Sequence, residues 1–221
     1  MKNPVVKKYE EEVPQFQYDI LETIKLSRKI PPIATPFDEV SKVRKSARFF
    51  KSVTVEELGT VLWYSAKVKS TFLKKNGYIL THRGTPSAGA RHPIDIIILN
   101  PNFLIENNFY YYNPFEHSLN QLNSPFSGMT TLFTGHINKI VEINNATIIW
   151  FVAHVNRTAA KYENAQSLIW RDAGALINNI QMTCTAIGIN SCPIGSLGEP
   201  YISNFFNPQP GVCGAGGLLI G

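Results

Sequence analysis

Apolar side chains at helical spacing begin just after Thr54. Leu58, Val61 and Leu62 recur at intervals of three and four residues, as on one face of an α-helix. Thr54 and Glu57 precede this pattern at the spacing of a capping box, which satisfies the first free N–H groups of a helix. The pattern therefore predicts a helix whose N-cap is Thr54.

Two further segments have helical patterns. Residues 165–187 carry apolar side chains every three or four positions, and Gly188 supplies a stop, so this segment predicts the longest helix of the chain. A shorter helix is predicted over residues 18–29, where Pro31 and Pro32 close the pattern.

Short runs of β-branched and aromatic residues predict strands over residues 94–99, 109–112 and 147–155. The first and third runs are apolar on both faces, as central strands are when helices cover the sheet on both sides. Residues 70–92 contain glycine, serine and proline and are predicted to form a mobile connection. Helices and strands follow one another irregularly, which favours an α+β fold.

The length of 221 residues fits one domain, and we divide it into an N-terminal extension with one short helix, residues 1–40, and a main domain, residues 41–221. The composition is 44% hydrophobic and 17% charged, which excludes a disordered chain. The longest apolar run, residues 148–153, is far shorter than the ~20 residues that cross a bilayer. Because the first residues are polar and mixed in charge, we expect a cytoplasmic protein with no membrane partner.

The net charge of +5 is concentrated in one part of the chain. Residues 42–91 carry 11 basic and 2 acidic side chains, which points to an anionic ligand. Nucleic acid is a second source of phosphate, but the block has no zinc-finger spacing, RNA-binding aromatic signature or long basic run. We therefore expect no nucleic-acid partner. The chain has three cysteines, Cys184, Cys192 and Cys213, an odd number without a CxxC spacing. This pattern predicts free thiols and no metal site.

Three segments carry candidate chemistry. Arg44, Ser46 and Arg48 alternate, so on extended backbone they point to one side, with Lys45 opposite, and could hold a phosphate. A solvated basic strand is the alternative. Residues 86–93 place small residues between two prolines, which predicts a tight loop that lets a flat ligand approach, or an ordinary strand entry.

The third segment, residues 188–195, follows the longest predicted helix. Its Cys-Pro-Ile-Gly turn offers backbone N–H donors. Cys192 could be a nucleophile, but the sequence shows no accompanying His–Asp pattern, so we interpret it as structural.

Together and in this order, the three segments resemble the nitroreductase-like FMN-dependent oxidoreductases. The stretches 83–93 (RGTPSAGARHP), 110–119 (YYYNPFEHSL), 161–162 (KY) and 172–174 (DAG) resemble more closely the SagB-type, or azoline, dehydrogenases. Those enzymes oxidise thiazoline or oxazoline rings in ribosomally made peptides to azoles.

The resemblance implies a nitroreductase-like fold, with an antiparallel-rich sheet flanked by helices, and an interlocked homodimer with FMN at the subunit interface. It implies that Arg44, Ser46 and Arg48 hold the flavin phosphate and ring edge, and that the Ser87 loop comes from the partner subunit. The residues that it assigns to cofactor binding are Arg44, Lys45, Ser46, Arg48, Pro86, Ser87, Ala88, Gly89, Pro193, Ile194 and Gly195.

The resemblance also implies that Lys161 and Tyr162 are the catalytic pair. Azoline oxidation needs a base that removes a ring proton while hydride leaves to the flavin, which oxygen then reoxidises. The alternative is a structural role, with Lys161 on the surface and Tyr162 packed against its neighbours. The substrate is expected to be a peptide or small molecule, and a cyclodehydratase complex is a candidate partner.

Two other functions remain open. One is an NAD(P)H-dependent nitro or quinone reductase, which would not depend on Lys161 and Tyr162. The other is a flavin-binding scaffold subunit that assembles a peptide-modifying complex without turnover. Purified protein that stays colourless with added FMN would favour the scaffold over both enzymes.

Overall fold

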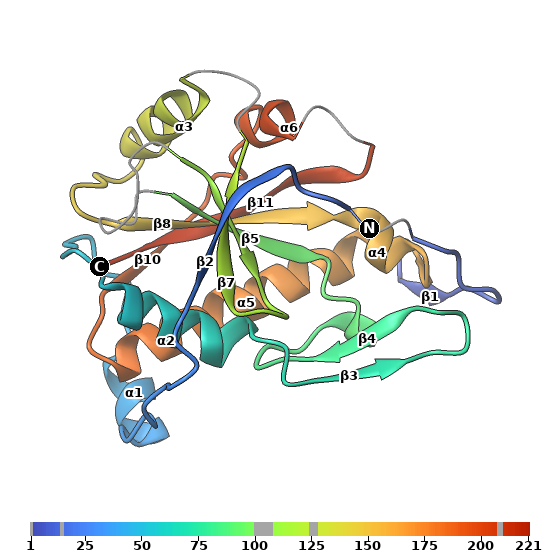
Figure 1. The fold of residues 1–221 in the computed structure, drawn as a ribbon, viewed down its shortest axis with the longest axis horizontal. Coiled ribbons are helices and arrows are strands. Elements are labelled where there is room, and N and C mark those ends of the chain that lie inside the picture. The colour runs from blue at the N-terminus through green and yellow to red at the C-terminus, as the bar shows by residue number, and fades with distance from the viewer. Residues whose placement is uncertain (1, 14–15, 100–107, 124–127, 207–209) are drawn as a thin grey trace.

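The computed structural model describes residues 2–13, 16–99, 108–123, 128–206 and 210–221. A seven-stranded sheet, with every neighbouring pair antiparallel, forms its centre (Figure 1). The strands, in order across the sheet, are β10 (Ser191–Ile194), β11 (Val212–Ile220), β8 (Thr147–His154), β5 (Ile94–Leu99), β6 (Tyr110–Asn113), β7 (Ser118–Leu122) and β2 (Ile20–Lys25).

Helices cover both faces of this sheet (Figure 1). On one face, α2 (Val55–Ala66) and α5 (Gln166–Ala186) pack against Ile96 and Ile98 of β5 and Phe151 of β8. On the other, α3 (Met129–Asn138) and α6 (Tyr201–Phe205) pack against Ile97 of β5 and Trp150 of β8. Alternate side chains of each central strand thus enter opposite core layers, which confirms the predicted two-sided burial and the α+β class.

Smaller elements complete the chain around the sheet. They are β1 (Val5–Val6), α1 (Phe37–Val43), β3 (Ser70–Leu73), β4 (Ile79–His82), the 3-10 helix η1 (Ala88–Ala90), α4 (Val155–Ala159) and β9 (Tyr162–Glu163). β1 pairs with β9, and β3 pairs with β4, in two separate two-stranded sheets. No helix in the described ranges has the length and apolar character needed to cross a bilayer.

The predicted helix over residues 18–29 is wrong, because residues 20–25 form β2 at the edge of the main sheet. Its backbone pairs with β7, and Leu26, which follows, is buried in the core. These tertiary contacts override a weak helical periodicity. The boundary proposed at residue 40 stays a prediction, although this strand of the N-terminal segment belongs to the main sheet.

The prediction of a mobile connection over residues 70–92 is also wrong, because the segment contains the β3–β4 hairpin and η1. Gly77 has a φ of +79° at the hairpin turn, which glycine adopts without steric cost. Asn76-Gly77 between β-branched and aromatic residues is a recognised hairpin signal that our interpretation missed.

The helix predicted from Thr54 is present as α2, with both hydrogen bonds of the capping box. Glu57 N donates to Thr54 Oγ1 at 3.1 Å, and Thr54 N donates to Glu57 Oε2 at 2.8 Å. The helix predicted over residues 165–187 is present as α5.

We predict that Thr54→Ala lowers the free energy of unfolding by about 1 kcal/mol. The substitution removes Oγ1, which accepts from Glu57 N, and loosens the geometry of the bond from Thr54 N to the Glu57 side chain. Urea denaturation measures this loss. The matched control is Thr131→Ala, an exposed threonine of α3, which we expect to change stability by less than about 0.5 kcal/mol. Equal effects of the two substitutions would contradict the capping role.

Candidate functional site

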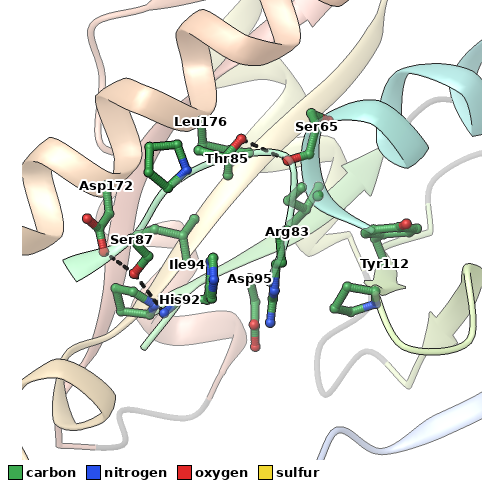
Figure 2. Close-up of a pocket in the computed structure, with 15 residues that line it drawn as sticks. Ser65, Arg83, Thr85, Ser87, His92, Ile94, Asp95, Tyr112, Asp172 and Leu176 are labelled. Atoms are coloured by element: carbon green, nitrogen blue, oxygen red, sulfur yellow. Dashed lines mark hydrogen bonds between the residues drawn. The ribbon is translucent and has the colours of Figure 1, made fainter. Parts of the chain in front are cut away.

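A hydrogen-bonded loop precedes the central strand β5. Ser87 Oγ donates to Asp172 Oδ2 at 2.5 Å (Figure 2), and Ala88 N donates to Asp172 Oδ1 at 3.1 Å. His92 N in turn donates to Ser87 Oγ at 2.8 Å. Burial raises the pKa of the Asp172 carboxyl, and the hydrogen bonds from the loop oppose that rise. Asp172 on α5 therefore fixes the position of the predicted flavin-covering loop.

The backbone of this loop is left-handed at three positions. Gly89 has a φ of +61°, Ala90 of +55° and His92 of +43°. Side-chain-bearing residues seldom adopt this region, and such conformations persist where the surrounding contacts enforce them. The loop is thus a constrained structure, in agreement with its predicted role as a tight turn.

Lys161 and Tyr162 converge on Gly89. A Cβ atom placed on Gly89 would lie 2.8 Å from Tyr162 Oη and 2.9 Å from Lys161 Nζ. Lys161 Nζ also lies 5.4 Å from the centroid of the Tyr162 ring. The predicted catalytic pair and the predicted flavin-covering loop are therefore brought together within one chain, and a side chain at position 89 would displace the tips of Lys161 and Tyr162.

The strand register explains this meeting. Ile94 at the start of β5 pairs with Ala153 near the end of β8. The loop that enters β5 and the segment that leaves β8 consequently lie at the same end of the sheet. Lys161 is further held by β1, because Lys7 N donates to the Lys161 carbonyl at 2.9 Å.

The predicted cofactor residues Arg44, Lys45, Ser46 and Arg48 lie at the opposite end of the sheet. Residues 44–48 are outside any helix or strand, and Ala47 N donates to the Ser191 carbonyl at the start of β10. Arg44 is half-buried, whereas Lys45, Ser46 and Arg48 are exposed. Pro193 and Ile194 belong to β10, and Gly195 follows it. Ile194 pairs with Gly217 and Gly217 with Trp150, so residues 193–195 lie level with the middle of β8.

The sheet separates these two groups. Ser191 pairs with Ile220 and Ile220 with Thr147, the first residue of β8. The predicted catalytic pair instead comes after the last residue of β8, beyond α4. An eight-residue strand spans about 23 Å. Figure 1 shows the C-terminus and β10 at one end and α4 and β1 at the other. One chain therefore does not bring Arg44–Arg48 to Lys161.

A buried ion pair that the sequence analysis missed lies beside the loop. Arg157 Nη1 and Nη2 donate to Asp95 Oδ1 and Oδ2 at 2.6 and 2.9 Å. Tyr18 Oη donates to Asp95 Oδ2 at 2.8 Å, and His154 Nε2 lies 3.0 Å from the same oxygen. Burial alone would raise the pKa of Asp95, but Arg157 and His154 hold it far below its usual range. A lone carboxylate inside an apolar strand was the available signal.

Two neighbouring cavities open beside this ion pair. The smaller one, about 30 Å³, is bordered by Ser87 and Asp172, and the larger one, about 390 Å³, extends toward the β3–β4 hairpin. Arg83, His92 and Asp95 border both. Burial, and then the charge of Arg83, lower the pKa of His92 to about 3, so this imidazole is neutral near pH 7.

The three cysteines are free thiols, and Cys192 is buried in β10. No group of three or more His, Cys, Asp or Glu side chains among the described residues could hold a metal ion.

Solved structures share this fold at low sequence identity. A protein assigned as a nitroreductase from Ralstonia eutropha JMP134 gives a TM-score of 0.66 at 18% identity, over 96% of this chain and 97% of that one. Another, from Anabaena variabilis ATCC 29413, gives 0.69 at 19% identity, over 98% of this chain but 42% of that chain. The E. coli microcin synthetase McbBCD complex, with truncated pro-MccB17 bound, gives 0.60 at 14% identity, over 96% of this chain and 78% of that chain.

A family model confirms the relationship by sequence. The model described as "Nitroreductase family" matches residues 42–218, which include both ends of the sheet described above. No curated protein matches the chain. Nitroreductase-family proteins are flavin oxidoreductases that typically bind a flavin such as FMN. Because one family model accounts for most of its length, the chain belongs to the nitroreductase family.

Proposed function

We propose that this protein is an FMN-dependent oxidoreductase of the azoline-dehydrogenase type. It oxidises thiazoline or oxazoline rings, or a similar C–N bond, in a peptide-derived substrate, and oxygen reoxidises the flavin. The observation that carries this proposal is the convergence of Lys161 Nζ and Tyr162 Oη on Gly89, in the loop expected to face the flavin. A general reductase has no use for such a pair.

The residues at the other end of the sheet suit the phosphate and ring edge of FMN. The Arg44 and Arg48 side chains have no hydrogen bond or ion pair among the described residues, so their charges are free to bind an anion. Gly195 is exposed, and no atom lies within 4 Å of a Cβ built on it. The full set proposed to hold FMN comprises Arg44, Lys45, Ser46, Arg48, Pro86, Ser87, Ala88, Gly89, Pro193, Ile194 and Gly195.

The site would divide the chemistry between cofactor and protein. Bound FMN supplies the acceptor for hydride. Conversion of an azoline to an azole also removes a proton from the neighbouring ring carbon. Lys161 Nζ or Tyr162 Oη receives this proton. The two-electron balance closes when oxygen takes up the electrons and two protons as hydrogen peroxide.

A second copy of the chain would complete this site. Arg44–Arg48 and Lys161–Tyr162 lie at opposite ends of one sheet, so a flavin held by the first group meets the second only if a partner contributes it. We therefore propose a homodimer in which each flavin lies at the interface, with Lys161, Tyr162 and the Ser87 loop of one subunit facing Arg44–Arg48 of the other.

The McbBCD neighbour supports a place in a peptide-modifying assembly, since that complex was solved with a truncated peptide bound. A cyclodehydratase, which makes azolines, is the partner class that this chemistry requires. The alternative of an NAD(P)H-dependent nitro or quinone reductase is supported by the solved relatives assigned as nitroreductases. A non-catalytic flavin-binding scaffold remains the third possibility, and flavin content with turnover decides among them.

We predict that Lys161→Ala and Tyr162→Phe each lower the kcat for an azoline-containing peptide by about 10²–10⁴-fold, because each loses a group that moves the ring proton. Flavin absorbance should stay at the parental level, since flavin binding is assigned to other residues. Turnover at the parental rate in both variants would contradict the azoline mechanism and favour the general reductase. Loss of turnover together with FMN would show that the pair is structural.

Arg44→Ala should weaken FMN binding by roughly 10- to 150-fold, because a charge-assisted hydrogen bond to phosphate is lost. Lys45→Ala is the comparison within the proposed set and should have a much smaller effect, since alternation turns the Lys45 side chain away from the phosphate. Equilibrium dialysis of each variant against FMN measures both constants. Equal weakening of FMN binding by the two substitutions would contradict the prediction that Arg44 faces the ligand and Lys45 faces away.

Mixed dimers test whether the site is shared between subunits. Arg44→Ala and Lys161→Ala are co-expressed and assayed at an FMN concentration at which Arg44→Ala alone stays unloaded. If Arg44 and Lys161 act in different subunits, a mixed dimer contains one intact site, and random pairing should restore roughly a quarter of the parental activity. Activity no higher than that of the separate variants would contradict the shared site.

A further inference from the structure

The larger cavity brings together three arginines from separate parts of the chain. Arg83 follows β4, Arg91 follows η1 and Arg157 lies in α4, and all three line the cavity of about 390 Å³. This volume lies within the range of small-ligand pockets. The cavity is bounded by the N-terminal segment at Phe16 and by the β3–β4 hairpin at Tyr78.

The three guanidiniums differ in how their charge is balanced. Arg157 is fully paired, with two hydrogen bonds to Asp95. Arg91 is 2% exposed, lies against Glu10 and stacks at 4.0 Å on the Tyr78 ring. Its Nε and Nη1 atoms have no hydrogen-bond partner in the described part of the chain.

Arg83 has the fewest direct partners of the three arginines. Its Nε donates to Thr81 Oγ1 at 3.1 Å, and its terminal nitrogens have no hydrogen bond or ion pair with any described residue. Figure 2 shows the Arg83 side chain alongside those of Asp95 and His92. Burial lowers the pKa of Arg83, since the surroundings do not fully replace water around its charge. Arg83 is half-buried and shares the negative charge of Asp95 with Arg157, so a ligand carboxylate would add a counter-charge and hydrogen-bond partners for its terminal nitrogens.

Resting on the function proposed above, we propose that this cavity is a subsite for a carboxylate of the peptide substrate, and that Arg83 binds it. A guanidinium matches the planar carboxylate with two parallel hydrogen bonds. Glu11 and Glu12 at the rim disfavour a doubly charged phosphate more than a singly charged carboxylate. The aromatic walls at Phe16 and Tyr111 suit the rest of a peptide.

The subsite adjoins the proposed reaction centre. Arg83 and His92 border both the large cavity and the small cavity next to Ser87. Ser87 is two residues from Gly89, which contacts Lys161 and Tyr162. A carboxylate held at Arg83 would therefore orient a ring a few residues away along the peptide. The carboxylate could come from an acidic side chain or from the C-terminus of the peptide.

The test uses synthetic peptides that carry one thiazoline, with the acidic group one to four residues from the ring. One set has a free C-terminal carboxylate, one has a C-terminal amide and a glutamate, and the third has neither acid. Calorimetric titration of the flavin-loaded protein measures binding to the parent, Arg83→Gln and Arg28→Gln. Arg28 is the matched control, because it is an exposed arginine whose ionic contact is Glu116, outside the cavity.

We expect at least one acidic set to bind the parent on the order of 10-fold or more tighter than the neutral set. The set that gains identifies the source of the carboxylate. Arg83→Gln should remove this preference, Arg28→Gln should keep it, and Arg83→Lys should keep part of it, since the charge remains without the planar fork. Equal binding of acidic and neutral peptides, binding of none, or a preference that survives in Arg83→Gln overturns the proposal.

Turnover of the same peptides separates this inference from the proposed function. Suppose that the preference for acidic peptides depends on Arg83 but that no thiazoline is oxidised. This result would support the carboxylate subsite and contradict the azoline chemistry. Oxidation of acidic and neutral peptides with the same KM would support the azoline chemistry and contradict the carboxylate subsite. If Arg83→Gln fails to fold, the acid-to-neutral ratio in the parent and in Arg83→Lys still decides the question.

Discussion

The burial of β5 and β8 on both faces is the constraint on which the rest of the structure depends. Side chains of the two strands alternate between two helix-covered core layers, so neither strand can shift by one residue without moving every apolar group into the wrong layer. The register between them is therefore fixed. It places Ile94 beside Ala153, and with them the loop before β5 and the segment after β8.

Fixed register converts residues distant in sequence into neighbours. Gly89 and Lys161 are separated by more than seventy positions, yet they touch because both lie just beyond paired strand ends. Asp172 reaches the same loop from α5, whose apolar face is anchored in the core beneath. The strained backbone at Ala90 is thus held by hydrogen bonds and packing on several sides, as a constrained functional loop requires.

Sequence patterns could predict the parts whose signal is local. The residue patterns that predict α2, α5, β5 and β8 each lie within one segment. The family resemblance supplied the proposed site residues, whose roles stay predictions. The strand β2 could not be read in this way, because its conformation comes from pairing with β7. The pairing of Asp95 with Arg157 likewise depends on the fold, although an isolated carboxylate in an apolar strand was visible in the sequence.

The fold divides the positive charge of the basic block, residues 42–91, between two places. Its charge excess suggested a single anionic ligand, but the chain distributes those charges to opposite ends of the sheet. Arg44 and Arg48 lie beside β10, whereas Arg83 and Arg91 line the cavity beyond the start of β5. About 23 Å of strand separates the ends, more than two Debye lengths at physiological salt, so exposed charges at one end contribute little to binding at the other. The positive charge of the block is therefore divided between two regions of the fold, each of which we propose to bind a different anion.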